Sequence, residues 1–554
     1  MTAPPELSVV VPTHDRRDLL VRLLESLGRQ TTPPDRFEVV VVVDGSTDGT
    51  LEAVADLATP FRLTVVDQPQ AGQSAARNAG AARATGHVLL FVDDDEEADP
   101  GLVAAHLEAH RDRRRIAGVG VIERRVPVDA DRVARLLAES AAAHTARLAK
   151  TTLTYLDAYG GNLSVPRSVF EEIGGYAEDL PRENDFEFAY RLHQARVEFA
   201  FLPGAIVTEY RERPWRGILR DIERRGQIAV ELYRRHPPII ATMELGGYGW
   251  QSRGRVIGRT LLQALRAPPS VAALPAFALP AESALAWLRL VLDYCYWRGV
   301  EAAADAELWK RSRRGTTVLR YHAFGGPDEP PSRYVVPAAR FNRQLSWLRR
   351  RGYNVISLTE YVEHRRAHRF PPAKSVVITM DDGYTDNDTL ARPILERHGF
   401  SATIFMITGG AGRHAASDPA LVDRPLLGLD RVRELVGGSI DVGAHTRSHP
   451  DLTAIDPPAA EAEVSGSKHD LERALGRPVG LFAYPQGAVD DRVRGIVAGA
   501  GFRAACGVKP GHNKPATDLF DLRRIEVRGT DSRLRFAAMV VVGEFRRRRS
   551  RGRD

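Results

Sequence analysis

The first hundred residues alternate between short apolar runs and stretches with helical periodicity. Four runs have the length of buried strands, and they cover residues 7–11, 37–43, 63–66 and 88–92. Three stretches between them have helical patterns, and they cover residues 15–30, 50–57 and 74–84. Nearly continuous apolar strands that alternate with helices are typical of a parallel sheet covered on both faces. We therefore expect an α/β fold that binds its ligands beyond the carboxyl ends of the strands.

A second alternating series begins at residue 316. Its apolar runs cover residues 318–321, 376–379, 402–407, 440–442, 481–484 and 503–505. Helical patterns with spaced leucines separate these runs. At least six strands alternating with helices over about 220 residues predict a barrel of the (β/α) kind.

The 554 residues allow two to four domains. From Pro214 to Arg314 the chain is rich in arginine, alanine and proline and carries no catalytic pattern. We expect an α/β ligand-binding domain in residues 1–250, a helical connector in 251–315, a barrel in 316–540 and a basic tail in 541–554.

The formal net charge is +6, and Arg546–Arg549, Arg551 and Arg553 contribute much of it. Such a run is typical of a solvated tail, with a tether to anionic lipid or glycan as the alternative. No basic motif indicates nucleic-acid binding. Two cysteines exclude a disulfide framework. We see no signal peptide, and the uncharged stretch 267–281 is too short to span a bilayer, although it leaves room for an interfacial contact.

Polar residues follow the strands of the first series. Pro12 and Thr13 come after the first strand, Asp44 opens the turn DGSTDGT, and Asp93–Asp95 follow the run HVLLFV. Adjacent carboxylates repel one another unless a cation binds, and hard oxygen ligands suit Mg²⁺ or Mn²⁺. A solvated acidic turn is the alternative for the three aspartates alone.

The strings VVVPTHDR, VVVVDGSTDGT and GQSAARNAGAARATGHVLLFVDDDEEADP resemble the family-2 glycosyltransferases with the GT-A fold, which are Rossmann-like nucleotide-sugar enzymes. The resemblance covers residues 7–210. It implies that Asp44 contacts the base of a nucleotide-sugar donor, such as a UDP-sugar, and that Pro12 and Thr13 line the nucleoside pocket. It places Arg77 near the nucleotide. Asp93 and Asp95 form its D-x-D element for metal and diphosphate, and Asp94 between them joins the donor site.

Two later segments resemble the acceptor side of the same family. The first is GGNLSVPRSVFEEIGGY, and the second, ENDFEFAYRL, matches its E-D-x-E-L-x-x-R-L element. The match makes Asp185 the candidate base for an acceptor hydroxyl. Asn184 stands where Glu is usual, so Glu183 is an alternative if the register slips. A carboxylate at a helix start is also favoured by the helix dipole alone.

The second series carries TMDDG after one strand and HTRSH after another. Two histidines at i and i+4 lie on one face of a helical turn and can share a metal. A third, carboxylate ligand leaves open positions for water and substrate. Separately, HTRSH is consistent with a polar loop and DDG with a turn. Both motifs at strand ends predict a metal site.

These motifs, with VLRYHAFG, FAYPQG and LRRIEV, resemble the NodB-type polysaccharide deacetylases of carbohydrate esterase family 4 across residues 316–530. The resemblance implies an irregular (β/α)₇ barrel. It makes Asp382, His445 and His449 ligands of a divalent metal, often Zn²⁺. It makes Asp381 the base that activates the attacking water.

The chain departs from this family at two points. Ala483 replaces an arginine that many members carry two residues before the proline of FAYPQG, and no L-x-H follows Tyr484. In many members that late histidine protonates the leaving amine. His322 and His512 are the remaining candidates for the acid, and a hydrogen-bonded strand end equally explains His322.

We expect a bifunctional enzyme of cell-wall or exopolysaccharide synthesis that builds a glycan on a glycan or lipid-linked acceptor and N-deacetylates an acetamido sugar. In one alternative the second half is a weak or inactive glycan-binding module. In another the chain is a non-catalytic scaffold. Nucleotide sugars are cytoplasmic, so we expect a cytoplasmic protein, peripheral at the inner face of the membrane.

Overall fold

The structure is a computed structural model of the whole chain. It describes residues 4–125, 151–158, 160–180, 184–210, 215–248, 252–409, 421 and 424–542, with isolated positions between 132 and 148. Contacts divide the chain into two compact units, Met1–Leu232 with Gly254–Ala303, and Tyr233–Arg253 with Ala304–Asp554. The arginine-rich tail predicted after residue 541 lies almost wholly outside the described residues.

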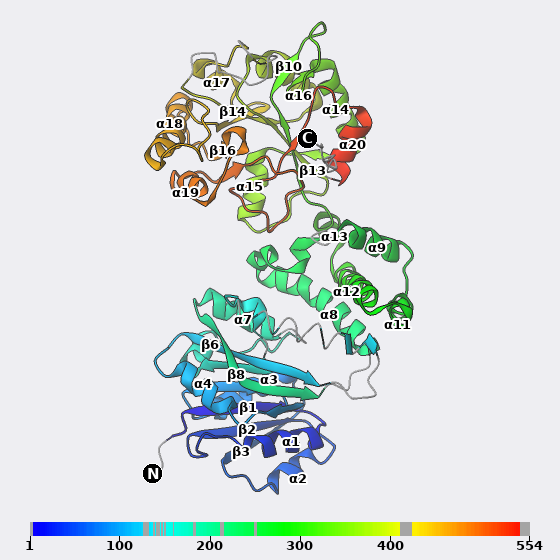
Figure 1. Cartoon of the computed structure of the whole chain (residues 1–554), viewed down its shortest axis with the longest axis vertical. Helices are drawn as coiled ribbons and strands as arrows, with labels where there is room; N and C mark the ends of the chain where they lie inside the picture. Colours follow the sequence, from blue (N-terminus) through cyan, green and yellow to red (C-terminus); the bar gives the residue numbers. More distant parts are fainter. Residues whose placement is uncertain are drawn as a thin grey trace, which may run out of the picture. The chain divides into compact units, whose positions relative to one another are not determined.

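The first unit contains an eight-stranded sheet in the order β3-β2-β1-β4-β7-β6-β8-β5 (Figure 1). Its strands are β1 (Leu7–Thr13), β2 (Phe37–Asp44), β3 (Arg62–Gln68), β4 (Val88–Val92), β5 (Glu96–Ala98), β6 (Ile116–Arg125), β7 (Asn162–Pro166) and β8 (Glu198–Tyr210). The first four strands are parallel, whereas β7 runs antiparallel to both β4 and β6. The sheet thus begins as the parallel α/β layer that the apolar runs predict and continues as a mixed layer, in which β7 and β5 run opposite to their neighbours.

Helices cover this sheet. They are α1 (Arg17–Leu27), α2 (Thr50–Ala55), α3 (Gln73–Arg83), α4 (Leu102–His110), α6 (Arg167–Glu172) and α7 (Asn184–Gln194). Four leucines of α1, Leu20, Leu23, Leu24 and Leu27, are buried in one core cluster with residues of β1 and β2, as their spacing predicts, whereas Leu19 is only partly buried. Because β1, β2 and β4 are parallel, their carboxyl ends bring the neighbourhoods of Thr13, Asp44 and Asp93 to one edge. This edge is the place where an α/β sheet binds its ligand.

Two long helices of the first unit, α8 (Trp215–Arg235) and α12 (Ala281–Ala303), cross at paired glycines. A Cβ on Gly226 would lie 1.9 Å from the carbonyl oxygen of Tyr296, and one on Gly299 would lie 1.8 Å from that of Glu223. Only glycine permits so close a backbone approach. The shorter helices of this region are α9 (Arg253–Ala264), α10 (Pro269–Ala273), α11 (Pro275–Ala278) and α13 (Ala306–Ser312).

The second unit is built on parallel strands in the order β17-β16-β15-β14-β13-β9-β18. They are β9 (Thr317–Tyr321), β13 (Ser375–Met380), β14 (Ala402–Met406), β15 (Ile440–Ala444), β16 (Leu481–Ala483), β17 (Ala504–Cys506) and β18 (Ile525–Glu526). The two edge strands are joined through the bridge of Cys506 with Leu522 and the bond from Arg524 N–H to the Lys509 carbonyl. The sheet therefore curls into the irregular barrel that the sequence predicts.

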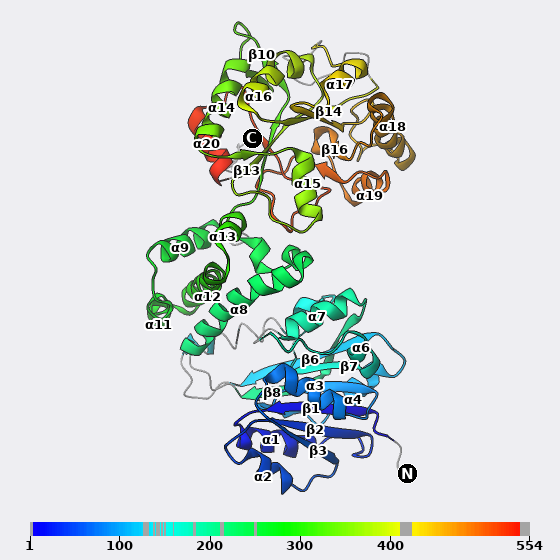
Figure 2. The same cartoon turned by 180° about the vertical axis from the view of Figure 1, so that it is seen from behind.

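Helices surround these strands (Figure 2). They are α14 (Ala338–Arg350), α15 (Leu358–Arg366), α16 (Arg392–His398), α17 (Leu429–Leu435), α18 (Pro457–Leu475), α19 (Asp491–Gly499) and α20 (Arg533–Val542). Two short strands, β10 (Ala323–Gly325) and β11 (Val335–Pro337), pair beside the barrel, and β12 (Asn354–Val355) pairs with β13. Across the described part of the chain, no helix has the length and hydropathy that crossing a bilayer requires.

Candidate active sites

Asp44 ends β2 and is held by the loop that leads into α3. Its carboxylate accepts hydrogen bonds from Gln68 Nε2 at 2.7 Å and from the backbone N–H groups of Ala71 and Gly72, both at 2.8 Å. Pro12 and Thr13 are buried at the end of the neighbouring strand β1. The structure thus brings these three predicted donor-site residues to adjacent strand ends, with the Asp44 carboxylate fixed in orientation.

Arg77 joins two predicted carboxylates from distant parts of the chain. It lies on α3 with a fully buried side chain, and it donates to Asp93 at 2.7 Å and to Asp185 at 2.5 Å. Burial opposes its charge, yet the carboxylates of Asp185 and Asp93 raise the pKa of Arg77 above its ordinary value. Asp185 stands in the first turn of α7, and its side chain is one-third exposed. The candidate base is therefore positioned by an arginine that also holds the first aspartate of the D-x-D element.

Two adjacent glycines, Gly160 and Gly161, lie directly against the carboxylates of Asp185 and Glu96. A Cβ on Gly160 would lie 2.0 Å from Asp185 Oδ1, and one on Gly161 would lie 2.6 Å from Glu96 Oε1. Any side chain here would push the carboxylates away. The motif GGN thus has a local physical role, which its resemblance alone did not reveal.

The other two aspartates of the triplet meet a different arginine. Arg16, in the loop after β1, lies 2.7 Å from Asp94 and 3.0 Å from Asp95. Burial raises the pKa of the Asp94 carboxyl to about 6, although the Arg16 charge acts against this shift. Asp93 and Asp95 are thus held by separate guanidinium groups.

The carboxylates beside the D-x-D element fit a divalent cation. Asp93, Asp95 and the buried Glu96 supply hard oxygen donors of the kind that Mg²⁺ and Mn²⁺ prefer. Burial, and then the negative charge of Asp93, raise the pKa of Glu96 well above its ordinary value. Asp93 and Asp95 each contact an arginine already, so a cation would add to the positive charge that stabilises them. Glu183 and the side chain of Asn184, the alternatives to Asp185, lie outside the described residues.

In the second unit, one carboxylate and two imidazoles converge at the mouth of the barrel. One ligand atom from each of Asp382, His445 and His449 lies within 4.8 Å of the other two. The Nε2 atoms of His445 and His449 lie 3.4 and 3.6 Å from Asp382 Oδ1. His445 Nδ1 lies 2.7 Å from the Ala483 carbonyl, which can only accept, so Nδ1 carries the proton. The Nε2 lone pair therefore faces Asp382, and the three groups fit Zn²⁺ or another divalent metal with open positions.

The conformation of HTRSH differs from the helical turn that we predict from its spacing. Thr446 and His449 have positive φ angles of 65° and 62°, and the segment after β15 is an irregular loop. Thr446 Oγ1 accepts the His449 N–H, and Glu463 accepts the N–H groups of Arg447 and Ser448. These tertiary hydrogen bonds replace helical ones. The two histidines picked out by their spacing therefore converge through a loop and not through a helical turn.

Asp381, the predicted base, accepts two hydrogen bonds from Arg524, a residue that the sequence did not single out. Arg524 NH1 and NH2 donate to the two carboxylate oxygens at 2.5 and 2.9 Å, and Arg524 Nε donates to the Gly507 carbonyl. Both side chains are buried. Burial favours the neutral acid, but the Arg524 charge outweighs it and lowers the pKa of Asp381. Arg524 lies in the motif LRRIEV. It supplies a positive charge beside Asp381, while Ala483 stands where we expected an arginine.

The two acid candidates lie at opposite ends of strand β9. His322 follows the carboxyl end, and the charges of Asp381 and Asp382 act on it, although burial lowers the pKa of His322 to about 4. Its ring packs on Tyr334, with centroids 4.7 Å apart. His512 precedes Asn513, which pairs with Thr316 at the amino end of β9, and it contacts the backbone of α20. The structure therefore brings only His322 to the predicted metal ligands.

Comparisons with known families match two separate regions of the chain, one in each half. Residues 8–174 match the model of glycosyl transferase family 2, and residues 368–505 match that of polysaccharide deacetylase. A putative polysaccharide deacetylase, YxkH of Bacillus subtilis, is 25% identical over 239 residues, which cover 43% of this chain and 80% of that protein. Validoxylamine A glucosyltransferase of Streptomyces hygroscopicus subsp. limoneus is 33% identical over 220 residues. That match covers 34% of this chain and 48% of the relative, so the chain spans only about half of it.

Solved structures also align with each half. The Streptococcus pyogenes deacetylase PplD, solved with acetate, is 26% identical and covers 39% of this chain and 94% of its own, with a TM-score of 0.35. The mannosyltransferase PcManGT of Pyrobaculum calidifontis, solved with GDP-Man and Mn²⁺, is 25% identical and covers 55% and 85%, with a TM-score of 0.35. The family matches thus show a region of glycosyl transferase family 2 in residues 8–174, followed in the same chain by a region of polysaccharide deacetylase in residues 368–505.

Proposed function

We propose that the chain is bifunctional, with each half active: the first transfers a sugar from a nucleotide-sugar donor to a glycan or lipid-linked acceptor, and the second removes acetyl groups from an acetamido sugar. The observation that carries the proposal is that both halves keep an ionisable base beside a cluster fit for a divalent cation. Asp185 stands beside Asp93 in the first, and Asp381 stands beside Asp382 in the second. An inactive barrel would have no physical need to retain Asp381 and Asp382, whose charges are buried.

In the transferase half, we assign donor binding to Asp44, Pro12 and Thr13, with Arg77, Asp93 and Asp94 toward the diphosphate. A bound Mg²⁺ or Mn²⁺, held by Asp93 and Asp95, would supply positive charge to the departing nucleoside diphosphate. Asp185 accepts the proton of the acceptor hydroxyl, which then attacks the anomeric carbon. Arg77 orients the Asp185 carboxylate while the acceptor approaches its exposed side.

In the deacetylase half, Asp381 accepts a proton from the attacking water, and Arg524 holds the carboxylate in its ionised form. Asp382, His445 and His449 would hold the metal, which polarises the acetamide carbonyl when bound. The hydrogen bond from His445 Nδ1–H to the Ala483 carbonyl keeps Nε2 available as a ligand. His322 is the candidate that donates a proton to the leaving amine.

Product analysis with a nucleotide-sugar panel and an acetylated glycan tests both halves. The full chain with Mn²⁺ is expected to transfer sugar, and mass spectrometry is expected to show loss of acetyl from the glycan. Asp185→Asn is expected to abolish transfer alone, and Asp381→Asn to abolish deacetylation alone. Each variant thus serves as the control for the other half. Equal deacetylation by Asp381→Asn and the wild type would refute the second activity.

One observation favours a second candidate function, in which the barrel is a weak or inactive glycan-binding module. In the described barrel, His322 is the one acid candidate near the metal ligands, and burial lowers its pKa to about 4. A neutral imidazole of low pKa is a poor proton donor at neutral pH. In that case glycan would bind to wild type and Asp381→Asn equally, with no acetate released by either.

We further propose that the chain works in the cytoplasm at the inner face of the membrane. Nucleotide sugars are made in the cytoplasm, and a lipid-linked acceptor would present both sites with substrate there. Fractionation of cells that express the full chain tests this location. Recovery of the protein from the medium would overturn it.

A further inference from the structure

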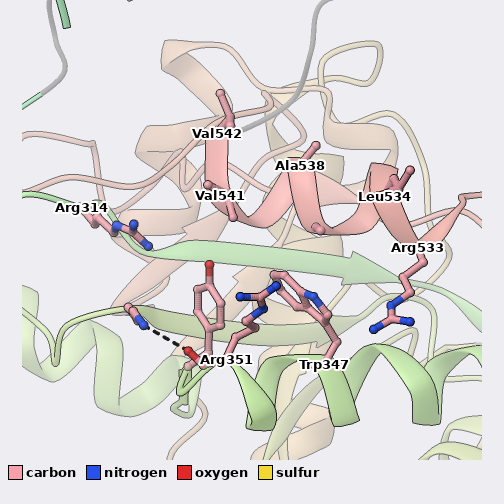
Figure 3. A pocket seen from close by; sticks show the side chains of 11 residues that line it. Arg314, Trp347, Arg351, Arg533, Leu534, Ala538, Val541 and Val542 are labelled. Atoms are coloured by element: carbon pink, nitrogen blue, oxygen red, sulfur yellow. Dashed lines mark hydrogen bonds between the residues drawn. The ribbon is translucent and has the colours of Figure 1, made fainter. Parts of the chain in front are cut away.

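A groove in the second unit combines exposed cations with an apolar helix face. It has a volume of about 680 Å³ and lies between α14 and α20 (Figure 3). Figure 3 shows Arg351 between the two helices, with Arg314 and Arg533 toward the ends of the groove. The basic residues that line it are Arg314, Arg351, Lys374 and Arg533, and Leu534 and Val541 of α20 line its apolar side.

The charge of the groove is one-sided. Its four basic side chains are all exposed, and no carboxylate lines the groove. Lys374 donates to the Arg351 carbonyl at 3.1 Å and lies over the Tyr353 ring, so its charge is not neutralised. Among the described residues, no carboxylate forms an ion pair with these four cations. Like charges gathered in this way destabilise one another, so the groove fits an anionic partner.

The apolar part of the groove is equally unusual for a solvated surface. Helix α20 buries Phe536, Met539 and Val540 in the barrel core. Its opposite face leaves Leu534 83% exposed, and Val541 and Val542 are about half exposed. Leu534 and Val541 are seven positions apart, so they lie on the same face of the helix. An inorganic anion would satisfy the cations but would leave this face in water.

We infer that this groove docks the chain onto an anionic phospholipid surface, with the basic side chains at the phosphates and the exposed face of α20 against the acyl chains. A lipid surface supplies both the negative charge and the apolar contact, and the combination is typical of proteins that lie in the interface. The inference deepens the proposed membrane location, but it rests on the groove and not on either activity.

A segment of the first unit, residues 254–281, exposes a further apolar surface. Of its three arginines, Arg266 is exposed, Arg255 is partly buried, and Arg259 is buried and paired with Asp293. Six large apolar side chains on α9 to α11 are more than one-third exposed, namely Ile257, Leu261, Leu265, Val271, Leu274 and Phe277. Apart from Leu156, every exposed large hydrophobic side chain in the described residues lies on this segment or on α20. Each unit therefore has a surface that fits a lipid interface.

Co-sedimentation of the full chain with vesicles tests the inference without measuring activity. Wild type is expected to sediment with vesicles of phosphatidylcholine and phosphatidylglycerol, less with phosphatidylcholine alone, and less as salt increases. Arg351→Glu with Lys374→Glu should weaken this binding about 25-fold, because each basic residue near an anionic surface contributes about fivefold. Arg397→Glu with Arg433→Glu, two exposed arginines outside the groove, makes the same charge change and should retain wild-type binding.

Two apolar variants complete the test. Leu534→Ser with Val541→Ser, and separately Leu261→Ser with Leu265→Ser, should each reduce binding, while the thermal unfolding midpoint stays near that of wild type. Failure of wild type to bind mixed vesicles would overturn the inference. So would wild-type binding by Arg351→Glu with Lys374→Glu. A concentration-dependent dimer that Leu534→Ser with Val541→Ser abolishes would instead assign the groove to a second copy of the chain. Loss of either enzymatic activity with intact vesicle binding would refute only the proposed function.

Discussion

Arg524 donates two hydrogen bonds to Asp381, at 2.5 and 2.9 Å, although the two residues are 143 positions apart in the sequence. The pair is buried, and Arg524 is further held by the Gly507 carbonyl. Strand β18 pairs with β9, and this pairing carries the guanidinium under the end of β13. The base thus obtains its counter-charge from the residue that directly precedes the last strand of the barrel.

Replacing Arg524 should impair the base without removing the metal site. Arg524→Gln is expected to lower deacetylation about 10²-fold, because Asp381 loses its orientation and its counter-charge. Since Arg524 lowers the pKa of Asp381, its loss raises that pKa and moves the acid limb of the pH–rate profile to higher pH. Arg524→Lys keeps the charge but not the paired contacts, so its acid limb should lie closer to that of wild type. An unshifted limb in Arg524→Gln would show that the arginine has only a structural role.

The sequence predicted both folds because apolar runs and their flanking motifs carry local information. Asp93 and Asp382 follow strands that periodicity reveals, so their positions at strand ends could be predicted. The hydrogen bonds from Arg524 to Asp381 could not be predicted, because they depend on which strands become neighbours in the sheet. The loop conformation of HTRSH could not be predicted either, because it depends on hydrogen bonds that its backbone N–H groups donate to the distant Glu463. The one signal in the sequence was Ala483, because an alanine at the position of an expected arginine suggests that another arginine takes its place.

Removing a histidine should abolish the metal affinity of the barrel. His445→Asn is expected to weaken Zn²⁺ binding at least about 100-fold by titration calorimetry, because Asp382 and His449 alone give an incomplete set of ligands. Asp430→Asn, an exposed carboxylate on α17, is the matched control and should bind as wild type does. Unchanged affinity in His445→Asn would exclude these three residues as the ligands.

Adding one methyl group at Gly160 should disturb the transferase base. Gly160→Ala places a Cβ 2.0 Å from Asp185 Oδ1, so either the carboxylate or the turn before β7 must move. A displacement of about 1 Å at a reacting group costs about 10²-fold in rate. Steady-state sugar transfer measures the loss, and deacetylation should be unchanged. Gly204→Ala is the control, because its nearest neighbour would be 3.9 Å away.

A buried histidine should make the first unit sensitive to acid. His106 lies between Ser164 Oγ at 2.7 Å and Asn162 Oδ1 at 2.8 Å, and burial lowers the pKa of His106 to about 4. In the unfolded chain this imidazole takes up its proton near its ordinary pKa of 6.5. Between these two values the unfolded state binds more protons, so stability falls as the pH falls. Over that range the loss amounts to at most about 3 kcal/mol.

The acid sensitivity can be measured locally on strand β7, which carries both partners of His106. Hydrogen exchange of β7, corrected for its intrinsic pH dependence, should show a loss of protection between pH 7 and pH 5 in wild type. His106→Gln should begin with lower protection at pH 7, because its hydrogen bonds are poorer, but should lose less on acidification. His110 contacts the same Ser164 hydroxyl, and burial also lowers its pKa to about 4, so part of the dependence should persist. Identical pH dependence in wild type and His106→Gln would contradict the assignment of the effect to this imidazole.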